Sequence, residues 1–416
     1  MKRNLFLIPL FFVMSLHSQT IYHTQILHPT IKTLQIGLSG QNYSLPLIQL
    51  NSKDILEIQF DELSHNIHNY TYKVFHCNAD WTLSNLSTNE YLEGFTTGNI
   101  YDYALSQNTT YQYTHYRFIL PNDEMNFKIS GNYMVMIYEE NKMENPVAIA
   151  CFSVVEPKVN IIAKLRANTD IELSGRFQQL DIEVGLNGYR LQDPQSEIKM
   201  VVRQNNRIDN QVTNILPTYL STEKLSYINQ KALIFEGGNE YRHFDMSSIY
   251  VVGEGLDTIR FNKTFYDVYL KEDVPSTSKN YLSQPDLNGK FIIHYQEAFD
   301  DINTEADYMQ VHFSLYTGQP YFDGQVYIGG EYNYNLLNET SQMQYNFAEG
   351  RYNKTILLKQ GGYNYQYWFL PKGEKKASVE KIEGSYWQTN NEYTIYVYHR
   401  PWGGRYDKLI GVKVID

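Results

Sequence analysis

The densest group of potential metal ligands in the sequence comprises His65, His68, His76, Cys77 and Asp80. Such side chains bind Zn²⁺ when three or four of them converge on one tetrahedral point. His76 and Cys77 are neighbours in an alternating segment, and a β-strand would point them to opposite faces. We therefore expect neither a metal site nor a cofactor here, and interpret the group as a polar turn followed by a strand.

A second group of residues that could do chemistry is the acidic run of Asp300, Asp301, Glu305 and Asp307. Hydrolysis of a glycosidic bond uses two carboxylates about 5 to 10 Å apart. This run lies between two predicted strands, where a solvated loop is the ordinary interpretation. The sequence also has no G-x-S-x-G nucleophile elbow, and neither cysteine has recognisable catalytic surroundings. We expect the protein not to be an enzyme.

Aromatic residues near the C-terminal end form a third group. Trp368, Trp387, Trp402 and Tyr367 could build a stacking platform for a polysaccharide. However, Tyr367 alternates with other tyrosines along one face of a predicted strand and Trp368 lies on the opposite face, which is typical of a packed sheet. Packing in a core or an interface is therefore the favoured interpretation of these aromatics.

Trp402 differs from the other tryptophans because it lies in P-W-G-G-R, residues 401–405. Proline and glycine at this density predict a turn or loop. Such a loop would present Trp402 and Arg405 outward, and Trp and Arg are common at the centres of protein interfaces. We take both as candidate partner-binding residues.

The elements that must position these residues are strands. Short β-branched and aromatic runs with period-two alternation recur along the chain, with turn residues between them. The first series covers 31–37, 55–60, 70–77, 111–120, 132–138 and 147–155; the second covers 159–164, 180–186, 198–204, 232–235, 249–253 and 265–271. Each series has the number of strands of an immunoglobulin-like sandwich. Pro157 is expected to end the first one, because proline cannot donate into a central ladder.

A third series follows the aperiodic, Pro- and Ser-rich segment 272–289, which we interpret as a linker. It covers 290–295, 309–316, 324–329, 342–347, 352–358, 363–370, 393–399 and 408–415. Its pattern resembles the early-set sandwich of glycogen-binding and starch-branching modules. The sequence thus predicts an all-β protein of three tandem immunoglobulin-like or early-set β-sandwich domains, over residues 20–156, 157–275 and 286–416.

Length and composition agree with this prediction. A chain of 416 residues exceeds what one hydrophobic core normally holds. Its net charge of −11 argues against nucleic acid or an anionic membrane surface as a partner. Its 37 tyrosines suit pleated sheets and wet interfaces, because tyrosine is apolar in body and polar at its tip.

The first 19 residues predict export. Lys2 and Arg3 precede the apolar run 5–16, and Ser18 is a small residue at which cleavage would leave Gln19 first. The run is too short to span a membrane as a helix, although it could instead be retained as an anchor. In an oxidising compartment Cys77 and Cys151 could form a disulfide, but each also lies in an apolar strand where a buried free thiol is common. Both interpretations of the cysteines stay open.

Several short motifs occur in a fixed order along the first 245 residues. They are H-C-N-A-D-W at 76–81, E-Y-L-E-G-F at 90–95, S-Q-N-T-T-Y at 106–111, L-P-N at 120–122, S-G-N-Y at 130–133, V-R-Q-N-N-R-I-D-N at 202–210 and G-G-N-E-Y-R-H-F-D at 237–245. In this order the motifs resemble the type IX secretion system plug proteins of Bacteroidota, whose first domain was long filed as one of unknown function.

The resemblance implies a function and a partner. A member of this family would bind the very large outer-membrane β-barrel translocon of the type IX system from the periplasm, and would seal its periplasmic opening when no substrate is passing. The alternative from another class is an exported carbohydrate-binding β-sandwich protein of a glycan-degrading system, which rests on the pattern of the third domain alone.

The expected contact residues lie in the segment 77–108, which has weak strand periodicity and carries several of the family motifs. A loop of this length is uncommon unless it is functional. Its exposed aromatic candidates are Trp81, Tyr91, Phe95 and Tyr101. For Trp81, packing beneath its own loop is an equally good interpretation.

Overall fold

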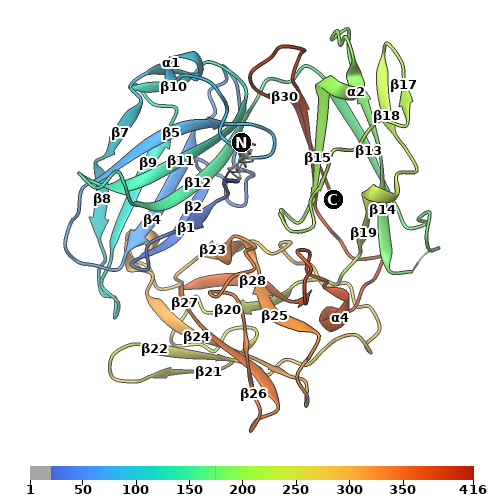
Figure 1. Cartoon of the computed structure of the whole chain (residues 1–416). Coiled ribbons are helices and arrows are strands. Elements are labelled where there is room, and N and C mark those ends of the chain that lie inside the picture. Colours follow the sequence, from blue (N-terminus) through green and yellow to red (C-terminus); the bar gives the residue numbers. More distant parts are fainter. Residues whose placement is uncertain (1–19, 174) are drawn as a thin grey trace, which may run out of the picture.

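The computed structural model describes residues 20–173 and 175–416, and nearly all regular structure in these ranges is β. The strands form three β-sandwiches, each of which lies beside the other two (Figure 1). The predicted all-β sandwich class is confirmed. The predicted signal peptide, residues 1–19, lies outside the described residues.

The first sandwich is built from residues that precede Pro157. One of its sheets has the order β1 (Gln25–Ile26), β12 (Pro146–Val155), β11 (Gly131–Glu139), β5 (Tyr70–Cys77) and β7 (Thr97–Ile100), with β3 (Leu47–Gln49) also on β12. The other has the order β2 (Ile31–Leu38), β4 (Leu56–Glu62), β9 (Thr114–Leu120) and β8 (Asp102–Leu105). A short pair, β6 (Leu92–Gly94) and β10 (Met125–Phe127), follows helix α1 (Thr88–Tyr91).

The core of this sandwich follows directly from the alternation in its sequence. Tyr70, Tyr72 and Val74 of β5 are buried between the two sheets, whereas the intervening Thr71 and Lys73 face outward and are half-buried. Successive side chains of a strand point to opposite faces, so one apolar set covers one face.

The second sandwich combines strands from two distant parts of the chain. One sheet has the order β13 (Asn160–Arg166), β14 (Phe177–Gly185), β18 (Lys224–Tyr227) and β17 (Tyr219–Leu220), with β19 (Ile234–Glu236) also on β14. The other has the order β16 (Val212–Thr213), β15 (Ile198–Gln204), β29 (Tyr393–His399) and β30 (Lys408–Ile415). Short helices α2 (Pro194–Glu197) and η1 (Lys231–Leu233) precede β15 and β19.

The third sandwich lies between these two parts in sequence. One sheet has the order β20 (Arg242–Asp245), β28 (Gly361–Pro371) and β23 (Phe291–Ile293), with β25 (Gly324–Gly329) also on β28. The other has the order β21 (Leu256–Phe261), β22 (Tyr266–Leu270), β24 (Tyr308–Tyr316), β27 (Arg351–Lys359) and β26 (Gln344–Asn346). Helices α3 (Ile302–Glu305), η2 (Glu331–Asn333) and α4 (Glu380–Glu383) lie in its connections.

The structure therefore differs from the expected tandem ranges 157–275 and 286–416. The third sandwich is inserted into the second, because β29 pairs with β15 along seven residues and places Ile395 and Val397 in the core of the second sandwich. The expected linker 272–289 lies inside the third sandwich, between β22 and β23. Alternation identifies a strand but not its partner, so the C-terminal strands could not be assigned from the sequence.

Two smaller expectations also differ from the structure. Residues 249–253 form no strand, and Tyr250, Val251 and Val252 are exposed there. The segment 77–108 is not one long loop, because α1, β6, β7 and β8 lie within it. The strands β7 and β8 are four residues each, too short for their alternation to stand out in the sequence.

The first and third sandwiches are joined by a buried cluster of charged and polar side chains. The Asp61 carboxylate accepts hydrogen bonds from Lys359 Nζ at 2.6 Å and Tyr308 Oη at 2.7 Å, and its other oxygen lies 2.7 Å from His115 Nδ1. Burial alone would raise the pKa of Asp61, but the Lys359 charge and the hydrogen bond with His115 hold it below its ordinary value.

The other two contacts between sandwiches also contain buried charges. Between the first and second, Asp407 is fully buried and accepts hydrogen bonds from Ala79 N, Arg400 Nε and Lys199 Nζ. Between the second and third, Arg207 binds Asp209 and donates to the Ala377 carbonyl. These ionic contacts, together with an apolar cluster between β12, β15, β29 and β30, hold the three sandwiches as one body.

Candidate partner-binding site

The five residues that suggested a metal site do not share a site. His76 is buried between the rings of Tyr133 and Tyr406, where burial lowers its pKa to about 4. His68 lies 2.8 Å from Glu62, on another part of the first sandwich. Asp80 accepts hydrogen bonds from its own turn, at Thr82. Within residues 20–173 and 175–416, no three His, Cys, Asp or Glu side chains form a group that could hold a metal ion.

The two cysteines are free thiols, each on the same outer face of the first sheet. Cys77 belongs to β5 and Cys151 to β12, and β11 lies between these strands. Two strand spacings alone put at least about 9 Å between the cysteines, beyond the reach of a disulfide. Burial raises the pKa of Cys77 to about 12, so its thiol stays protonated.

Three of the four acidic residues bind main-chain groups, whereas Asp300 is exposed as expected for a solvated loop. Asp301 begins helix α3 and accepts a hydrogen bond from Asn303 N, while Glu305 accepts from the N–H groups of residues 299–301. Asp307 is buried and accepts from Thr110 N and Tyr111 N of the first sandwich. These carboxylates are therefore occupied by structural hydrogen bonds.

The tryptophans of the proposed sugar platform lie far apart. Trp368 is fully buried, with the Arg207 guanidinium 4.1 Å from its ring centre. Trp387 hydrogen-bonds through its backbone N to Gly175, near the start of β14, whereas Trp402 lies at the other end of the second sandwich. These aromatic rings share no common surface.

Trp81 and Tyr91 are packed residues rather than exposed ones. Trp81 sits in a tight turn with φ of 64°, and its half-buried ring packs against the cluster that contains Cys77 and Cys151. Tyr91 is only 4% exposed and donates a hydrogen bond from its hydroxyl to the Val74 carbonyl at 3.2 Å. The expectation that Tyr91 is exposed is wrong, because the short helix α1 turns its side chain into the core.

Phe95 and Tyr101 lie where a partner could reach them. Their exposed fractions are 64% and 77%, and Tyr103 two residues further on is 43% exposed. Phe95 precedes β7, Tyr101 lies between β7 and β8, and Tyr103 lies in β8. We call these three residues the distal edge. β7 is the last strand of one sheet and β8 the last of the other, so a single segment forms the outer side of the first sandwich (Figure 1).

The loop after β29 presents Trp402 and uses Arg405 internally. Trp402 is 91% exposed, although its backbone N–H is bound by Glu197. Arg400 holds the same loop through Asp407 and Asn78. Arg405 pairs with Glu90 of the first sandwich, so its charge is already matched. The loop is thus a fixed platform for one exposed indole.

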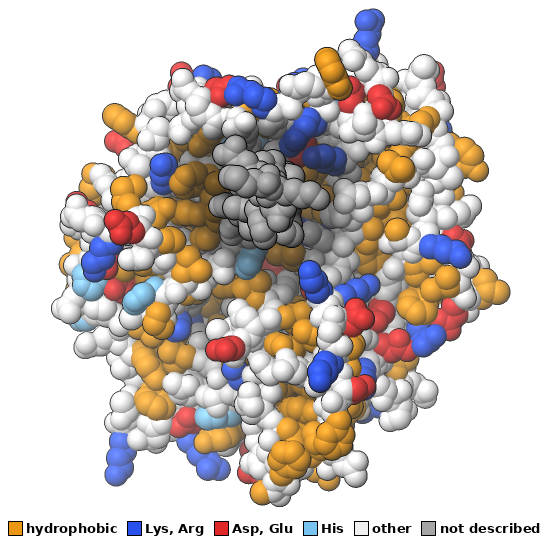
Figure 2. Space-filling model, in the orientation of Figure 1, with side chains coloured by type: hydrophobic (Ala, Val, Ile, Leu, Met, Phe, Trp, Pro, Cys, Tyr) orange, Lys and Arg blue, Asp and Glu red, His pale blue; other side chains and the backbone are white. Residues whose placement is uncertain are grey.

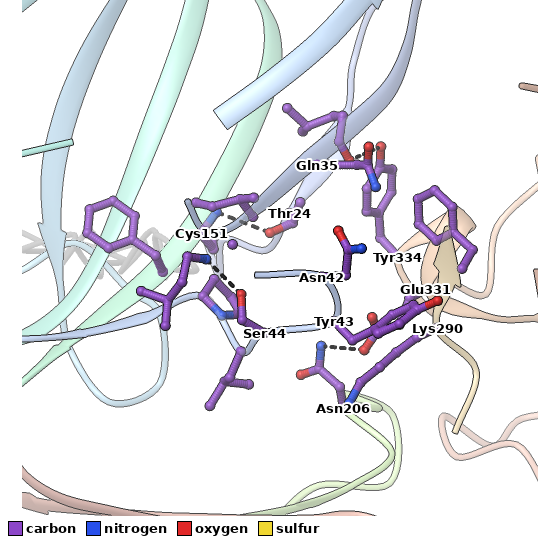
Figure 3. A pocket seen from close by; sticks show the side chains of 18 of the residues that line it. Thr24, Gln35, Asn42, Tyr43, Ser44, Cys151, Asn206, Lys290, Glu331 and Tyr334 are labelled. Atoms are coloured by element: carbon purple, nitrogen blue, oxygen red, sulfur yellow. Dashed lines mark hydrogen bonds between the residues drawn. The ribbon is translucent and has the colours of Figure 1, made fainter. Parts of the chain in front are cut away.

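A hollow of about 810 Å³ lies where the three sandwiches meet. Hydrophobic side chains border it on the face seen in Figure 2. The loop 40–46 of the first sandwich, the turn after β15 and the strand β23 contribute to its wall. In Figure 3, Tyr43 and Lys290 lie beside Glu331, which accepts a hydrogen bond of 3.2 Å from Asn206 Nδ2.

Sequence reasoning missed Tyr103 and the polar residues of the hollow. Tyr101 and Tyr103 alternate in Y-D-Y, which predicts a strand edge once the strand is recognised. Arg203, Lys290, Glu331 and Glu392 come from separate strands and connections, so their spacing in the sequence carries no sign of convergence.

Helices contribute little to the molecule, and none in the described part of the chain has the length and apolar character needed to cross a membrane.

Comparisons with known proteins agree with the motif order. A profile of the type 9 secretion system plug protein first domain matches residues 31–156, which is the first sandwich. A crystal structure of a hypothetical protein from Parabacteroides merdae superposes with a TM-score of 0.94 at 43% sequence identity, covering 95% of this chain and 100% of that one. No curated protein matches the chain. Matched by this profile over its first sandwich, the chain belongs to the type IX secretion system plug protein family.

Proposed function

We propose that the protein is a non-catalytic periplasmic plug, which binds the outer-membrane translocon of the type IX secretion system and seals its periplasmic opening when no substrate is passing. The observation that carries this proposal is the match of the whole first sandwich to the plug family, which is not a known enzyme family. The partner would be a very large outer-membrane β-barrel, and no nucleic acid or direct membrane insertion is involved.

The rigidity of the molecule supports a sealing role. A stopper must keep its shape against a wide opening. Here the buried Asp61–Lys359 ion pair joins the first and third sandwiches, and the buried Asp407 carboxylate accepts a hydrogen bond from Ala79 N where the first and second sandwiches meet. Breaking such a pair by removing one partner costs about 3 to 5 kcal/mol, so separate movement of the sandwiches is strongly disfavoured.

The exposed aromatics supply a plausible contact surface for this partner. The distal edge combines large apolar side chains with two sheet edges, and Trp402 adds an exposed indole on a fixed loop. Aromatic residues of this kind contribute much of the free energy of protein binding. Phe95, Tyr101 and Trp402 are therefore the proposed partner-binding residues, with Tyr103 added.

Co-purification tests the binding step. We expect the tagged full-length protein, recovered from detergent-solubilised outer membranes, to bring with it a very large barrel protein. Recovery of the tagged protein without any barrel, from cells that contain the barrel, would contradict the proposal.

Cell fractionation tests the location. Because residues 1–19 have the charge and apolar run of a signal peptide, we expect the mature chain in the periplasm, held at the outer membrane through the translocon. Recovery of most of the protein from the culture medium, or as an integral membrane protein, would contradict this location.

A further inference from the structure

Strand β23 of the third sandwich has one edge without a partner strand in the described part of the chain. Among the described strands, its only neighbour is β28. Backbone hydrogen bonds from Asn364 N to Lys290 O and from His294 N to Gln360 O fix the register of this pair. Along an antiparallel strand, residues that bond to the neighbouring strand alternate with residues whose N–H and C=O groups point the other way. Because Lys290 and His294 bond on the side of β28, Phe291 and Ile293 direct their N–H and C=O groups away from it.

These main-chain groups have no hydrogen-bond partner within the described residues. Outside the β23–β28 ladder, no hydrogen bond among residues 20–173 and 175–416 involves the N–H or C=O of Phe291 or Ile293. Both residues line the central hollow, together with the edge strand β2 of the first sandwich on another side. The hollow therefore contains an open strand edge of the kind that pairs with an added strand.

The side chain beside this edge indicates what kind of strand would fit. The Glu331 backbone N–H binds Gly289 O, which places Glu331 next to the start of β23. Among the described residues its carboxylate forms no ion pair, and the neighbouring Lys290, whose charge acts on it, is paired with Glu392 at 2.6 Å. Burial raises the pKa of Glu331 to about 6, and a cation brought into the hollow would relieve that penalty.

We propose that the central hollow binds an extended polypeptide segment of a partner, which pairs with the open edge of β23 and places a Lys or Arg side chain against Glu331. The segment would exchange hydrogen bonds with Phe291 and Ile293, as strands do when they extend a sheet. The free N–H and C=O groups of a strand edge recur every second residue. An extended polypeptide presents matching donors and acceptors at this spacing, whereas an isolated small molecule does not. The proposal rests on the proposed plug function only for the source of the segment, which would be the translocon.

A synthetic peptide tests the site without the translocon. The probe is Ac-TVTKTVT-NH2, a strand-forming sequence with one central lysine, titrated calorimetrically into the full-length protein. We expect a Kd below about 1 mM, and binding at least about tenfold weaker when the lysine is replaced by glutamate. Hydrogen exchange of the Phe291 and Ile293 amides should slow when the unmodified peptide is bound.

Two variants remove the two kinds of contact separately. Ile293→Pro removes the outward N–H without touching the ladder to β28, because proline is tolerated on a strand edge. Glu331→Gln removes the negative charge and keeps the side-chain shape. Each variant should raise the Kd of the peptide by about tenfold. Glu57→Gln is the matched control, because Glu57 lines the same hollow on β4, away from β23, and should leave Kd unchanged.

Absence of peptide binding, or binding that both variants leave unchanged, would overturn the site. Loss of binding in the control as well as in the two variants would also overturn it, since the hollow would then lack the stated selectivity. None of these results bears on sealing, because the plug function is tested separately by outer-membrane permeability.

Discussion

Side chains four residues apart in the first sandwich have opposite roles. Tyr91 is buried and bonds to Val74, whereas Phe95 is 64% exposed. The sequence identifies both as aromatic residues in a family motif. The sequence cannot tell which of the two is buried. Helix α1 turns Tyr91 into the core, whereas Phe95 follows Gly94, whose φ of 92° redirects the chain after β6. Of the expected contact residues, Phe95, Tyr101, Trp402 and Arg405 are exposed, but the Arg405 charge is already paired with Glu90, so the three aromatic residues are the surface contacts to test.

The first prediction concerns the distal edge. The double variant Phe95→Ala, Tyr101→Ala should fold normally and bind the translocon more weakly by about 2 kcal/mol or more, because exposed aromatics at an interface centre carry such energies. Affinity is measured by titrating the purified barrel complex with labelled protein. Tyr250→Ala is the matched control, since Tyr250 is 77% exposed like Tyr101 but lies on the third sandwich. Normal binding by the double variant would move the contact surface elsewhere.

The second prediction concerns His76 and pH. Burial lowers the pKa of His76 from 6.5 to about 4, so the unfolded chain takes up a proton at a higher pH than the native protein does. The free energy of unfolding should therefore fall as pH drops from 6.5 to 4, by up to about 3 kcal/mol from this residue. His76→Gln should flatten that dependence in urea titrations across this range. The exposed His28→Gln control should keep the wild-type slope, and an unchanged slope in His76→Gln would contradict the assignment.

At the scale of elements, strands were predictable and their partners were not. β5, β15, β25, β29 and β30 begin and end where the alternation predicts. Alternation reports which face of a strand is buried, but pairing depends on the register of backbones far apart in the chain. The insertion of the third sandwich could therefore not be predicted, and neither could the contact between Asp407, in the loop after β29, and Lys199 of β15.

The third prediction tests how the loop after β29 is held. Asp407→Asn removes the charge that Arg400 and Lys199 share, and leaves those cations beside a neutral amide. Because Asp407 is fully buried, we expect a loss of about 3 kcal/mol in the free energy of unfolding. Asp323→Asn is the control, since Asp323 pairs with Lys381 at the surface and its loss should lower the free energy of unfolding far less than Asp407→Asn does. Equal effects of the two variants would mean that the loop is not held by Asp407.

At the scale of the whole molecule, three sandwiches meet around one hollow and are joined by buried charges. The acidic net charge and the tyrosine content were readable from the sequence. The contacts between the sandwiches could not be predicted from the sequence, since Asp61 and Lys359 lie 298 positions apart and neither lies in a recognisable motif. A rigid body with an exposed aromatic edge suits the proposed occlusion of a wide opening better than it suits catalysis.

The fourth prediction tests the joint between the first and third sandwiches. Asp61→Asn leaves the buried Lys359 ammonium without its counter-charge and should lower the free energy of unfolding by about 3 to 5 kcal/mol. Adding Lys359→Met should recover most of that loss, because an apolar side chain of similar length needs no counter-charge. Chemical denaturation of the single and double variants measures both effects. A double variant no more stable than Asp61→Asn would show that the joint does not depend on this pair.

Outer-membrane permeability tests the central proposal most directly. A deletion strain should take up a large hydrophilic antibiotic that the parent strain excludes, and should do so only while the translocon barrel is present. Cargo secretion should continue, because an occluder is dispensable for transport itself. Restoring the wild-type gene should restore exclusion. Unchanged resistance of the deletion strain, in cells confirmed to contain the barrel, would contradict the account of this protein as a plug.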